Sequence, residues 1–417
     1  MTKKYFESIA KRYATIIKNT GYLSLIEIMR ILLPFVAVAY IVNIIGKDNY
    51  GLVVFCQTII YYFSVFINWG LDISAVKNVS VNRSNDEKLS EIVSSVLTTK
   101  FVLFIIAFLI ILTIIYTNKF AYTNRLLFLF AFATCISDVI FCPWFFQGIE
   151  KMKYMTITKA VSLIFYASSV FIFIKDKSDY EFIALFQSLG NILAGLISII
   201  LLYKIANIKF NKPNFQNVKK TIIDGTQFFI SMFSVVLNNT IAKSLSGIFF
   251  KMDVVAAFDI AQKISLGAYV PIQMLNQAVY PHIAKTLDKN FVKKFFKFNI
   301  GLSLGIAIIF FITAKLTVGL FINGDNSISV TILRILCIRI FFAGISNYLG
   351  TPILVSFGHS KQFNISIILS TFLIILLYIL LFIFNCFTVN IFAFIMVLTE
   401  IFVIVYRMYY CKKYQII

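Results

Sequence analysis

The sequence has little charge. Asp, Glu, Lys and Arg together make up 13% of its 417 residues, whereas 60% of the residues are hydrophobic. This shortage excludes a disordered chain and an ordinary soluble enzyme, because both need a larger share of polar surface. The mean hydropathy of +0.89 instead requires many membrane spans.

Other shortages exclude particular kinds of site. The six cysteines show no C-x-x-C or C-x-H spacing and lie mostly in apolar runs, which predicts packing residues and neither a metal site nor a disulfide framework. The two histidines, His282 and His359, are isolated, so we expect them at the membrane interface. The phosphate-binding pattern G-x-x-x-x-G-K-[ST] is absent, which argues against direct use of ATP. The sequence therefore predicts no catalytic residue, no metal and no cofactor.

The net charge of +20 does not indicate a nucleic-acid partner, because no segment is long and polar enough to gather basic residues on an aqueous surface. Residues 1–20 place lysines beside apolar residues at near-helical spacing, which predicts a basic amphipathic helix on the membrane surface. The apolar run that follows has no small-residue cleavage site, so this segment does not resemble a cleavable signal.

The long apolar runs predict an all-α polytopic membrane protein with twelve transmembrane helices. Their expected bounds are 21–45, 51–70, 100–117, 126–146, 160–174, 182–203, 226–250, 255–280, 298–318, 330–357, 363–384 and 391–410. These runs are far longer than the roughly ten-residue segments of a membrane barrel, which is why we expect helices. Lys and Arg concentrate in alternate loops, and this bias predicts that both termini are cytoplasmic.

A polar stretch over 204–224 divides the predicted spans six and six. We therefore expect an N-terminal six-helix lobe over 21–203, a cytoplasmic linker over 204–224 and a C-terminal six-helix lobe over 225–417. A faint internal echo supports two related halves, since Asp48 and Gln57 recur at the same spacing as Asp253 and Gln262. Because each half starts on the same side, the lobes would be related by a parallel pseudo-two-fold axis.

Five basic residues lie inside the predicted spans: Arg30, Lys243, Lys263, Arg334 and Arg339. Each costs about 2.5–3.5 kcal/mol at mid-helix in lipid, so we expect them to face a shared, wet interior that binds an anionic cargo. Arg334 and Arg339 are about 140° apart around a helix, so one is expected to face the cavity and the other a neighbouring helix. The alternative for Arg30 and Lys263 is a structural ion pair. Their helical neighbours for such pairs are Glu27 and Asp259.

The deep acidic residues are candidates for coupling to H⁺ or Na⁺, because an ion-driven transporter needs such groups. They are Glu27, Asp138, Asp259 and Glu400. For Asp138 the alternative is a structural role, capping a helix end that is kinked before Pro143.

Several motifs run along the whole chain. They are Ile45–Gly51 (IGKDNYG), Trp69–Asp72 (WGLD), Pro143–Met152 (PWFFQGIEKM) preceded by Asp138, and, in the second half, Asp253, Ala261–Ile264 (AQKI) and Tyr280-Pro281. In these motifs the chain resembles the lipid-linked oligosaccharide flippases of the O-antigen type (Wzx). They belong to the polysaccharide transporter family of the multidrug/oligosaccharidyl-lipid/polysaccharide exporter superfamily. The chain departs from the family pattern at Lys47 and Lys77.

The resemblance implies a V-shaped pair of lobes around a central cavity that opens alternately to each side. It implies a flippase, not an enzyme, in the bacterial cytoplasmic (inner) membrane. The cargo would be an oligosaccharide repeat unit on undecaprenyl diphosphate, moved from the inner to the outer leaflet. The implied partners are this glycolipid, membrane lipids, H⁺ or Na⁺, and the glycan polymerase and chain-length machinery.

Two alternatives stay open at this point. A drug or organic cation antiporter of the same superfamily would need a net acidic or aromatic cavity, whereas here five in-span basic residues face four deep acids. A membrane glycan polymerase or ligase would need a sizeable outer loop to meet the sugar. The longest predicted outer loop lies near Asn323–Ser329 and is too short for this.

Overall fold

The structure is a computed structural model that describes residues 35–206, 208–211 and 213–417. The described residues form helices and no β-strand, which confirms the all-α prediction for this part of the chain. The predicted amphipathic helix over 1–20 and residues 21–34 of the first predicted span lie outside the described residues.

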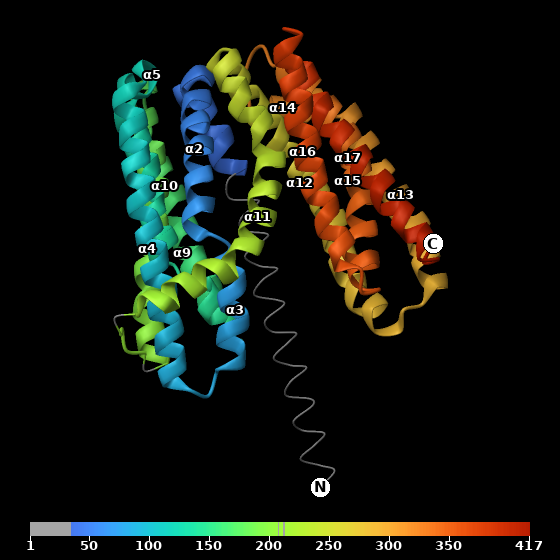
Figure 1. Cartoon of the computed structure of the whole chain (residues 1–417). Helices are drawn as coiled ribbons and strands as arrows, with labels where there is room; N and C mark the ends of the chain where they lie inside the picture. The colour runs from blue at the N-terminus through green and yellow to red at the C-terminus, as the bar shows by residue number, and fades with distance from the viewer. Residues whose placement is uncertain (1–34, 207, 212) are drawn as a thin grey trace. The chain divides into compact units, whose positions relative to one another are not determined.

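A helix over Phe35–Ile45 comes first in the described chain. The helices that follow are α2 (Lys47–Asn68), α3 (Leu71–Val81), α4 (Asp86–Thr117), α5 (Lys119–Thr123), α6 (Arg125–Phe132), α7 (Thr134–Ile140), α8 (Pro143–Gly148), α9 (Met152–Phe173), the 3₁₀-helix η1 (Lys177–Asp179), α10 (Tyr180–Ala206), α11 (Phe215–Phe249), α12 (Met252–Thr286), α13 (Lys289–Ile312), α14 (Ala314–Gly319), α15 (Ser327–Tyr348), the π-helix η2 (Leu349–Val355), α16 (Ser360–Ile383) and α17 (Val389–Lys413) (Figure 1).

Ten helical stretches of the described chain are long and apolar enough to cross a membrane, so the protein is a multi-pass membrane protein. They coincide with ten of the twelve predicted spans. The eighth predicted span corresponds to α12, which has 35 residues but is too polar to be counted by hydropathy. The count of twelve, the V shape and the pseudo-two-fold axis stay predictions.

The chain divides into two compact units. Of the described residues, the first unit holds those up to Ile45 together with Ile59–Met232, and the second holds Gly46–Thr58 and Phe233–Ile417. Of the three boundaries, those after Thr58 and Met232 fall inside helices, so α2 and α11 each contribute residues to the two units. The division into lobes at 204–224 stays a prediction.

The PWFFQG motif forms part of the core of the first unit. Trp144, Phe145 and Phe146 of α8 are buried in a core cluster that also holds residues of α3 and α4, and Gly148 contacts Val79 of α3 so closely that a Cβ would overlap its side chain. Because Pro143 cannot donate a backbone hydrogen bond, it begins α8 after a break at Phe141 and Cys142. The motif is therefore accounted for by packing.

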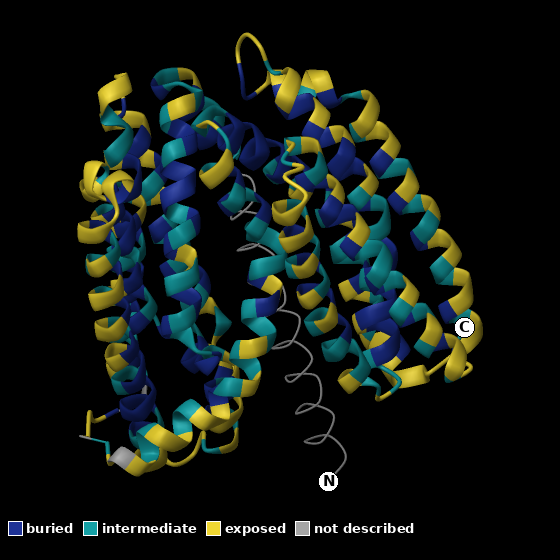
Figure 2. Cartoon of the chain, turned by 45° about the horizontal axis from the view of Figure 1, so that its top comes forward, coloured by how far each residue is buried: buried dark blue, intermediate teal, exposed yellow. Residues whose placement is uncertain are grey.

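In the second unit, α15 is the central helix and packs against α12, α13 and α17 (Figure 1). The outer helices expose apolar side chains: on α13, for example, Ile309 and Ile312 are more than half exposed. Figure 2 shows exposed residues along the outward faces and buried residues on the faces turned into each unit. Exposed apolar faces on helices of this length are the surfaces that contact lipid.

Candidate functional site

A buried cluster of charge lies where α11, α12 and the start of α2 meet in the second unit. The Asp259 carboxylate of α12 accepts hydrogen bonds from Lys243 Nζ (2.6 Å, Oδ1) and Lys263 Nζ (2.6 Å, Oδ2). Tyr50 OH donates to Asp259 Oδ2 at 2.6 Å and accepts from Lys263 Nζ at 2.7 Å. The side chain of Asp259 is 4% exposed, whereas that of Lys263 is 32% exposed. One buried carboxylate is therefore shared by two ammonium groups, so among the described residues of this cluster the positive charges outnumber the negative one.

The IGKDNYG motif builds this cluster. Gly46 adopts a left-handed backbone (φ 82°) that turns the chain into α2, a conformation that glycine accepts without strain. Gly51 lies against the α12 backbone, and a Cβ there would overlap the Met252 carbonyl oxygen. This close approach of α2 to α12 brings Tyr50 within reach of Asp259. Tyr50 is thus a site residue that sequence reasoning missed, although it lies inside a motif that was recognised.

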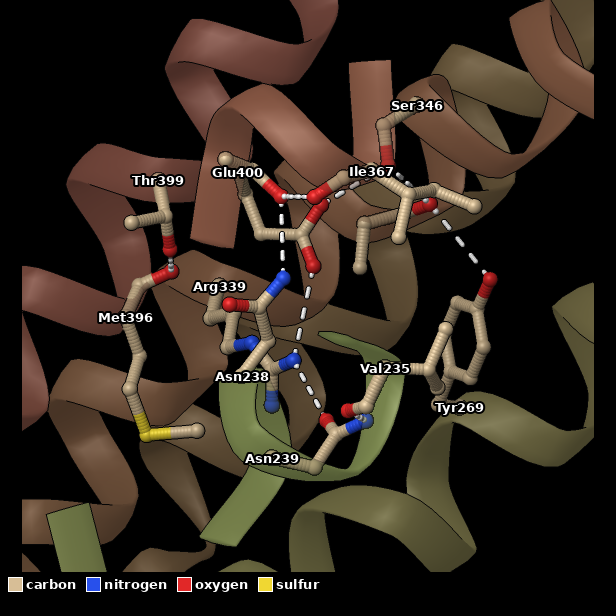
Figure 3. A network of polar contacts seen from close by, with 12 residues as sticks. Val235, Asn238, Asn239, Tyr269, Arg339, Ser346, Ile367, Met396, Thr399 and Glu400 are labelled. Atoms are coloured by element: carbon tan, nitrogen blue, oxygen red, sulfur yellow. Dashed lines mark hydrogen bonds and ion pairs between the residues drawn. The ribbon is translucent and has the colours of Figure 1, made fainter. Parts of the chain in front are cut away.

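A second polar network surrounds Arg339 of α15 (Figure 3). Arg339 Nη2 donates to Asn239 Oδ1 of α11 at 3.0 Å and forms an ion pair with Glu400 Oε1 of α17 at 3.4 Å. The other carboxylate oxygen of Glu400 accepts a hydrogen bond from Ser346 Oγ at 2.8 Å. Arg339 Nε is buried and has no hydrogen-bond partner among the described residues. The guanidinium is therefore held by one long ion pair and one amide, with donor capacity left over.

The two networks are joined through α11. Gln262 of α12 donates from Nε2 to the Asn239 carbonyl oxygen at 2.7 Å, and Lys243 follows Asn239 by one helical turn. A polar tract therefore runs from Lys263 to Glu400 through four helices of the second unit. We call it the basic tract, and its charged members are Lys243, Asp259, Lys263, Arg339 and Glu400.

A cavity of about 400 Å³ opens beside Arg339 and Glu400, entirely among helices of the second unit. Its lining is rich in amides and hydroxyls, and its charged members are Arg339, Glu400 and Arg407. Arg407 was also missed from the sequence. It lies near the C-terminal end of the last predicted span, where an arginine is ordinarily interfacial, whereas here it is 5% exposed.

The other predicted basic residues lie elsewhere. Arg334 is exposed and places its guanidinium over the ring of Phe311 of α13 at 5.5 Å, away from the cavity that Arg339 lines. This separation agrees with the angle expected from their spacing. Arg30 and Glu27 lie outside the described residues.

The first unit contains a separate buried charge cluster around Lys100 of α4. Lys100 Nζ donates to Asp72 Oδ1 (2.6 Å), Asn68 Oδ1 (2.8 Å) and the Asp138 carbonyl oxygen (3.1 Å), and its side chain is 1% exposed. Asn68 Nδ2 donates to Asp138 Oδ1 at 3.1 Å, while Asp138 Oδ2 is buried without a hydrogen-bond partner among the described residues.

Lys100 is not among the predicted site residues, because it stands at the first position of the predicted span 100–117. The helix in fact begins 14 residues earlier, at Asp86, after Asn85, whose side chain accepts from the Lys88 backbone N–H. The Asn85 cap and the acidic residues after it are an ordinary helix-start signal that would have placed Lys100 inside the helix.

No group of three or more His, Cys, Asp or Glu side chains suited to a metal ion occurs in the described part of the chain. The arrangement offers instead an excess of Lys and Arg donors beside a polar cavity. Such donors bind anions, with the guanidinium fork matched to phosphate and carboxylate oxygens.

The fold defines the class of protein. It matches a solved structure named "Lipid II flippase MurJ, inward closed conformation" with a TM-score of 0.75 at 13% identity, covering 93% of this chain and 87% of that one. It also matches an inward-facing multidrug resistance MATE family transporter of the MOP superfamily with a TM-score of 0.67 at 14% identity, covering 90% and 92%. The chain has the fold of these helical membrane proteins.

The chain belongs to the polysaccharide biosynthesis protein family, whose sequence pattern it matches over residues 16–287. A relative from Escherichia coli (strain K12), named "Putative O-antigen transporter", is 26% identical over 367 residues, which cover 86% of this chain and 88% of the relative. A protein of the same name from Shigella dysenteriae is 24% identical over 269 residues, covering 64% and 67%. The resemblance found in the motifs is confirmed at the level of the family.

Proposed function

We propose that this protein is a flippase that moves an oligosaccharide repeat unit linked to undecaprenyl diphosphate from the inner to the outer leaflet of the bacterial cytoplasmic membrane. The basic tract and its cavity would receive the phosphate-bearing head by alternating access while the lipid tail stays in the bilayer. The names of the relatives, which refer to O-antigen transport, support a surface polysaccharide as the cargo.

The observation that carries the proposal is the excess of positive charge inside the second unit. Lys243 and Lys263 share Asp259, and Arg339 is paired with Glu400, while Arg407 has no carboxylate partner among the described residues. Four cations thus face two anions. A buried excess of this size is costly in a membrane and is accounted for by a ligand of opposite charge.

The physical task fits this arrangement. A diphosphate head carries charge that is strongly stabilised by water, and its transfer into hydrocarbon without compensation is prohibitive. Guanidinium and ammonium groups in a polar cavity replace the lost hydration with charge-assisted hydrogen bonds. A basic cavity therefore lowers the barrier for an anionic head group and does not favour an organic cation.

Coupling to H⁺ or Na⁺ is a further part of the proposal, with Asp138, Asp259 and Glu400 as candidates. Asp138 is the most suitable by geometry, because one of its carboxylate oxygens is buried without a hydrogen-bond partner in the described structure. Asp259 is less suitable, because both of its carboxylate oxygens already accept hydrogen bonds from ammonium groups.

The second candidate function is an antiporter for organic cations, which the fold shared with the MATE transporter favours. The two are separated by reconstitution into liposomes with defined lipid-diphosphate sugars, with transbilayer movement measured with and without a pH or Na⁺ gradient. Movement of the glycolipid supports the flippase. Export of organic cations without movement of any glycolipid would establish the antiporter.

The basic tract is tested in cells by glycan display. The double variant Lys243→Ala with Lys263→Ala should abolish surface display of the glycan while the protein remains in the membrane. The matched control replaces two exposed lysines, Lys119 and Lys315, with Ala and should leave display intact. Normal display from the first variant would count against the assignment.

A further inference from the structure

We propose that the cavity of the second unit is a phosphate-binding site in which Arg407 is the fixed ligand and Glu400 is an internal competitor for Arg339. The inference rests on the proposed function and deepens it, because it names the part of the chain that receives the phosphate group and what occupies Arg339 before it arrives.

The position of Arg407 is built into the fold. Its Nη1 donates to the Ser346 carbonyl oxygen at 2.6 Å, its Nε donates to Ser366 Oγ at 2.9 Å, and the ring of Phe363 lies 4.7 Å from the guanidinium carbon. At Gly350 a Cβ would come within 2.6 Å of Arg407 Nη1, so the backbone of η2 leaves room for the guanidinium. Residues of α15, η2 and α16 thus hold one arginine of α17 in a single orientation at the cavity wall.

These partners are all neutral. No carboxylate lies within ion-pair distance of Arg407 in the described part of the chain. Glu400 lies across the same cavity and acts on Arg407 only at longer range. An arginine that is 5% exposed without a carboxylate in direct contact is costly, since buried charges are ordinarily paired. A structural arginine would have been placed opposite a carboxylate. This arginine faces an open cavity instead.

The residues that line the cavity favour an anionic ligand. Two guanidinium groups and one carboxylate line it, so it carries one net positive charge. The remaining lining supplies neutral donors from Asn, Gln, Ser, Thr and Tyr side chains, among them Asn238, Gln273 and Asn347. At about 400 Å³ the cavity lies within the size range of small-molecule sites. A phosphate or diphosphate group matches this combination of size, donors and charge.

Glu400 occupies the place of such an anion at Arg339. Its Oε1 lies 3.4 Å from Arg339 Nη2, which is long for a charge-assisted hydrogen bond, and its Oε2 is held by Ser346. Arg339 Nε remains without a partner among the described residues. A phosphate oxygen would accept a shorter hydrogen bond from Arg339. The Glu400 carboxylate would then keep its hydrogen bond from Ser346 and lose its ion pair with Arg339. Glu400 therefore stabilises the buried charge of Arg339 while the cavity is empty. An incoming anion must displace this carboxylate, which lowers the affinity of the cavity for anions.

The test measures binding of inorganic pyrophosphate to the purified full chain in nanodiscs by calorimetry, with inorganic phosphate and chloride as comparison anions. Arg407→Gln should weaken pyrophosphate binding by about tenfold to a hundredfold, since a charge-assisted hydrogen bond is lost. Glu400→Gln should tighten binding by about threefold or more, because the competitor loses its charge. Arg334→Gln is the matched control, since it removes an arginine of α15 that does not line the cavity, and it should bind as the wild type does.

The two substitutions are expected to change pyrophosphate affinity in opposite directions, which a purely structural role of Arg407 and Glu400 would not produce. If Arg407 and Glu400 only held helices together, both variants would lower the thermal unfolding midpoint and neither would tighten binding. Arg407→Lys keeps the charge and should retain much of the affinity even where Arg407→Gln folds poorly. Binding by both neutral variants at wild-type strength, or equal affinity for chloride and pyrophosphate, would overturn the inference.

Two further comparisons identify the natural ligand and keep failure of the site assignment distinct from failure of the proposed flippase function. A lipid-linked diphosphate that displaces pyrophosphate identifies a lipid head group as the ligand, whereas no displacement identifies a free phosphate. If the wild type moves glycolipid in liposomes and the variants bind pyrophosphate unchanged, the site assignment fails and the flippase stands. If the wild type binds pyrophosphate at Arg407 but moves no glycolipid, the flippase fails and the site stands.

Discussion

Lys100 is the most enclosed charge that the structure describes, and its replacement gives a quantitative test of the packing. In Lys100→Met the side chain keeps a similar length and apolar stem but loses three hydrogen bonds, to Asp72, Asn68 and the Asp138 carbonyl oxygen. Two neutral acceptors, Asn68 Oδ1 and the Asp138 carbonyl oxygen, would then lose the Lys100 donor.

The expected loss of folding stability in Lys100→Met follows from the burial of Lys100 and Asp72. Removing one member of a buried ion pair costs about 3–5 kcal/mol, because the other charge is left uncompensated. The side chain of Asp72 is 32% exposed, so water can solvate part of its charge, and we reduce the expected loss to about 2–4 kcal/mol. For a unit of this size the loss corresponds to a fall of about 5–15 °C in the unfolding midpoint.

The control is Lys88→Met in the same helix. Lys88 pairs with Glu91 at 2.8 Å, but its side chain is 57% exposed, so its replacement should change the unfolding midpoint little. Unfolding of both variants is followed by intrinsic fluorescence on heating in detergent. The double variant Lys100→Met with Asp72→Asn should recover part of the stability, since the stranded charge is removed. Equal midpoints for the two single variants would refute the reasoning.

Two other predictions concern the contacts of α2. Gly51→Ala should separate α2 from the α12 backbone and lower the unfolding midpoint by an amount equivalent to several kcal/mol, whereas Gly301→Ala, on an open helix face, should raise stability by about 0.5–1 kcal/mol. A neutral Gly51→Ala would show that the close approach is not required. Tyr50→Phe should cost about 1.5–3 kcal/mol through its lost bond to the Asp259 carboxylate, and Tyr116→Phe, at an exposed tyrosine, should change the midpoint little. Equal shifts in the two tyrosine variants would contradict this account.

The prediction of membrane helices from the sequence succeeded because hydrocarbon imposes one rule on every span. A run of about twenty apolar residues must satisfy its backbone internally, whatever lies beside it. Ten predicted spans have helices long and apolar enough to cross, and the short fifth span proved to begin at Met152, which restores its length. The polar character of α12 shows the limit of hydropathy, because that helix buries the polar side chains of Asp259 and Gln262 against protein.

The ion pairs were predictable only when both partners share a helix. Lys263 and Asp259 are four residues apart, and the ion pair that this spacing offered as the alternative role for Lys263 is present in the structure. Lys243 pairs with the same carboxylate from another helix, and Arg339 pairs with Glu400 across 61 positions. These contacts depend on how helices are rotated and packed, which the spacing within one helix does not contain.

The sequence by itself determined that this chain is a helical membrane protein with basic residues buried in its spans, and its motifs identified the family. Composition and periodicity suffice for this because the bilayer acts on each segment independently of the others. Only the tertiary structure decided that two lysines share Asp259, that Arg334 faces away from the cavity and that Arg407 lines it. Side chains from separate helices meet through packing, and packing is decided by the whole set of helices at once.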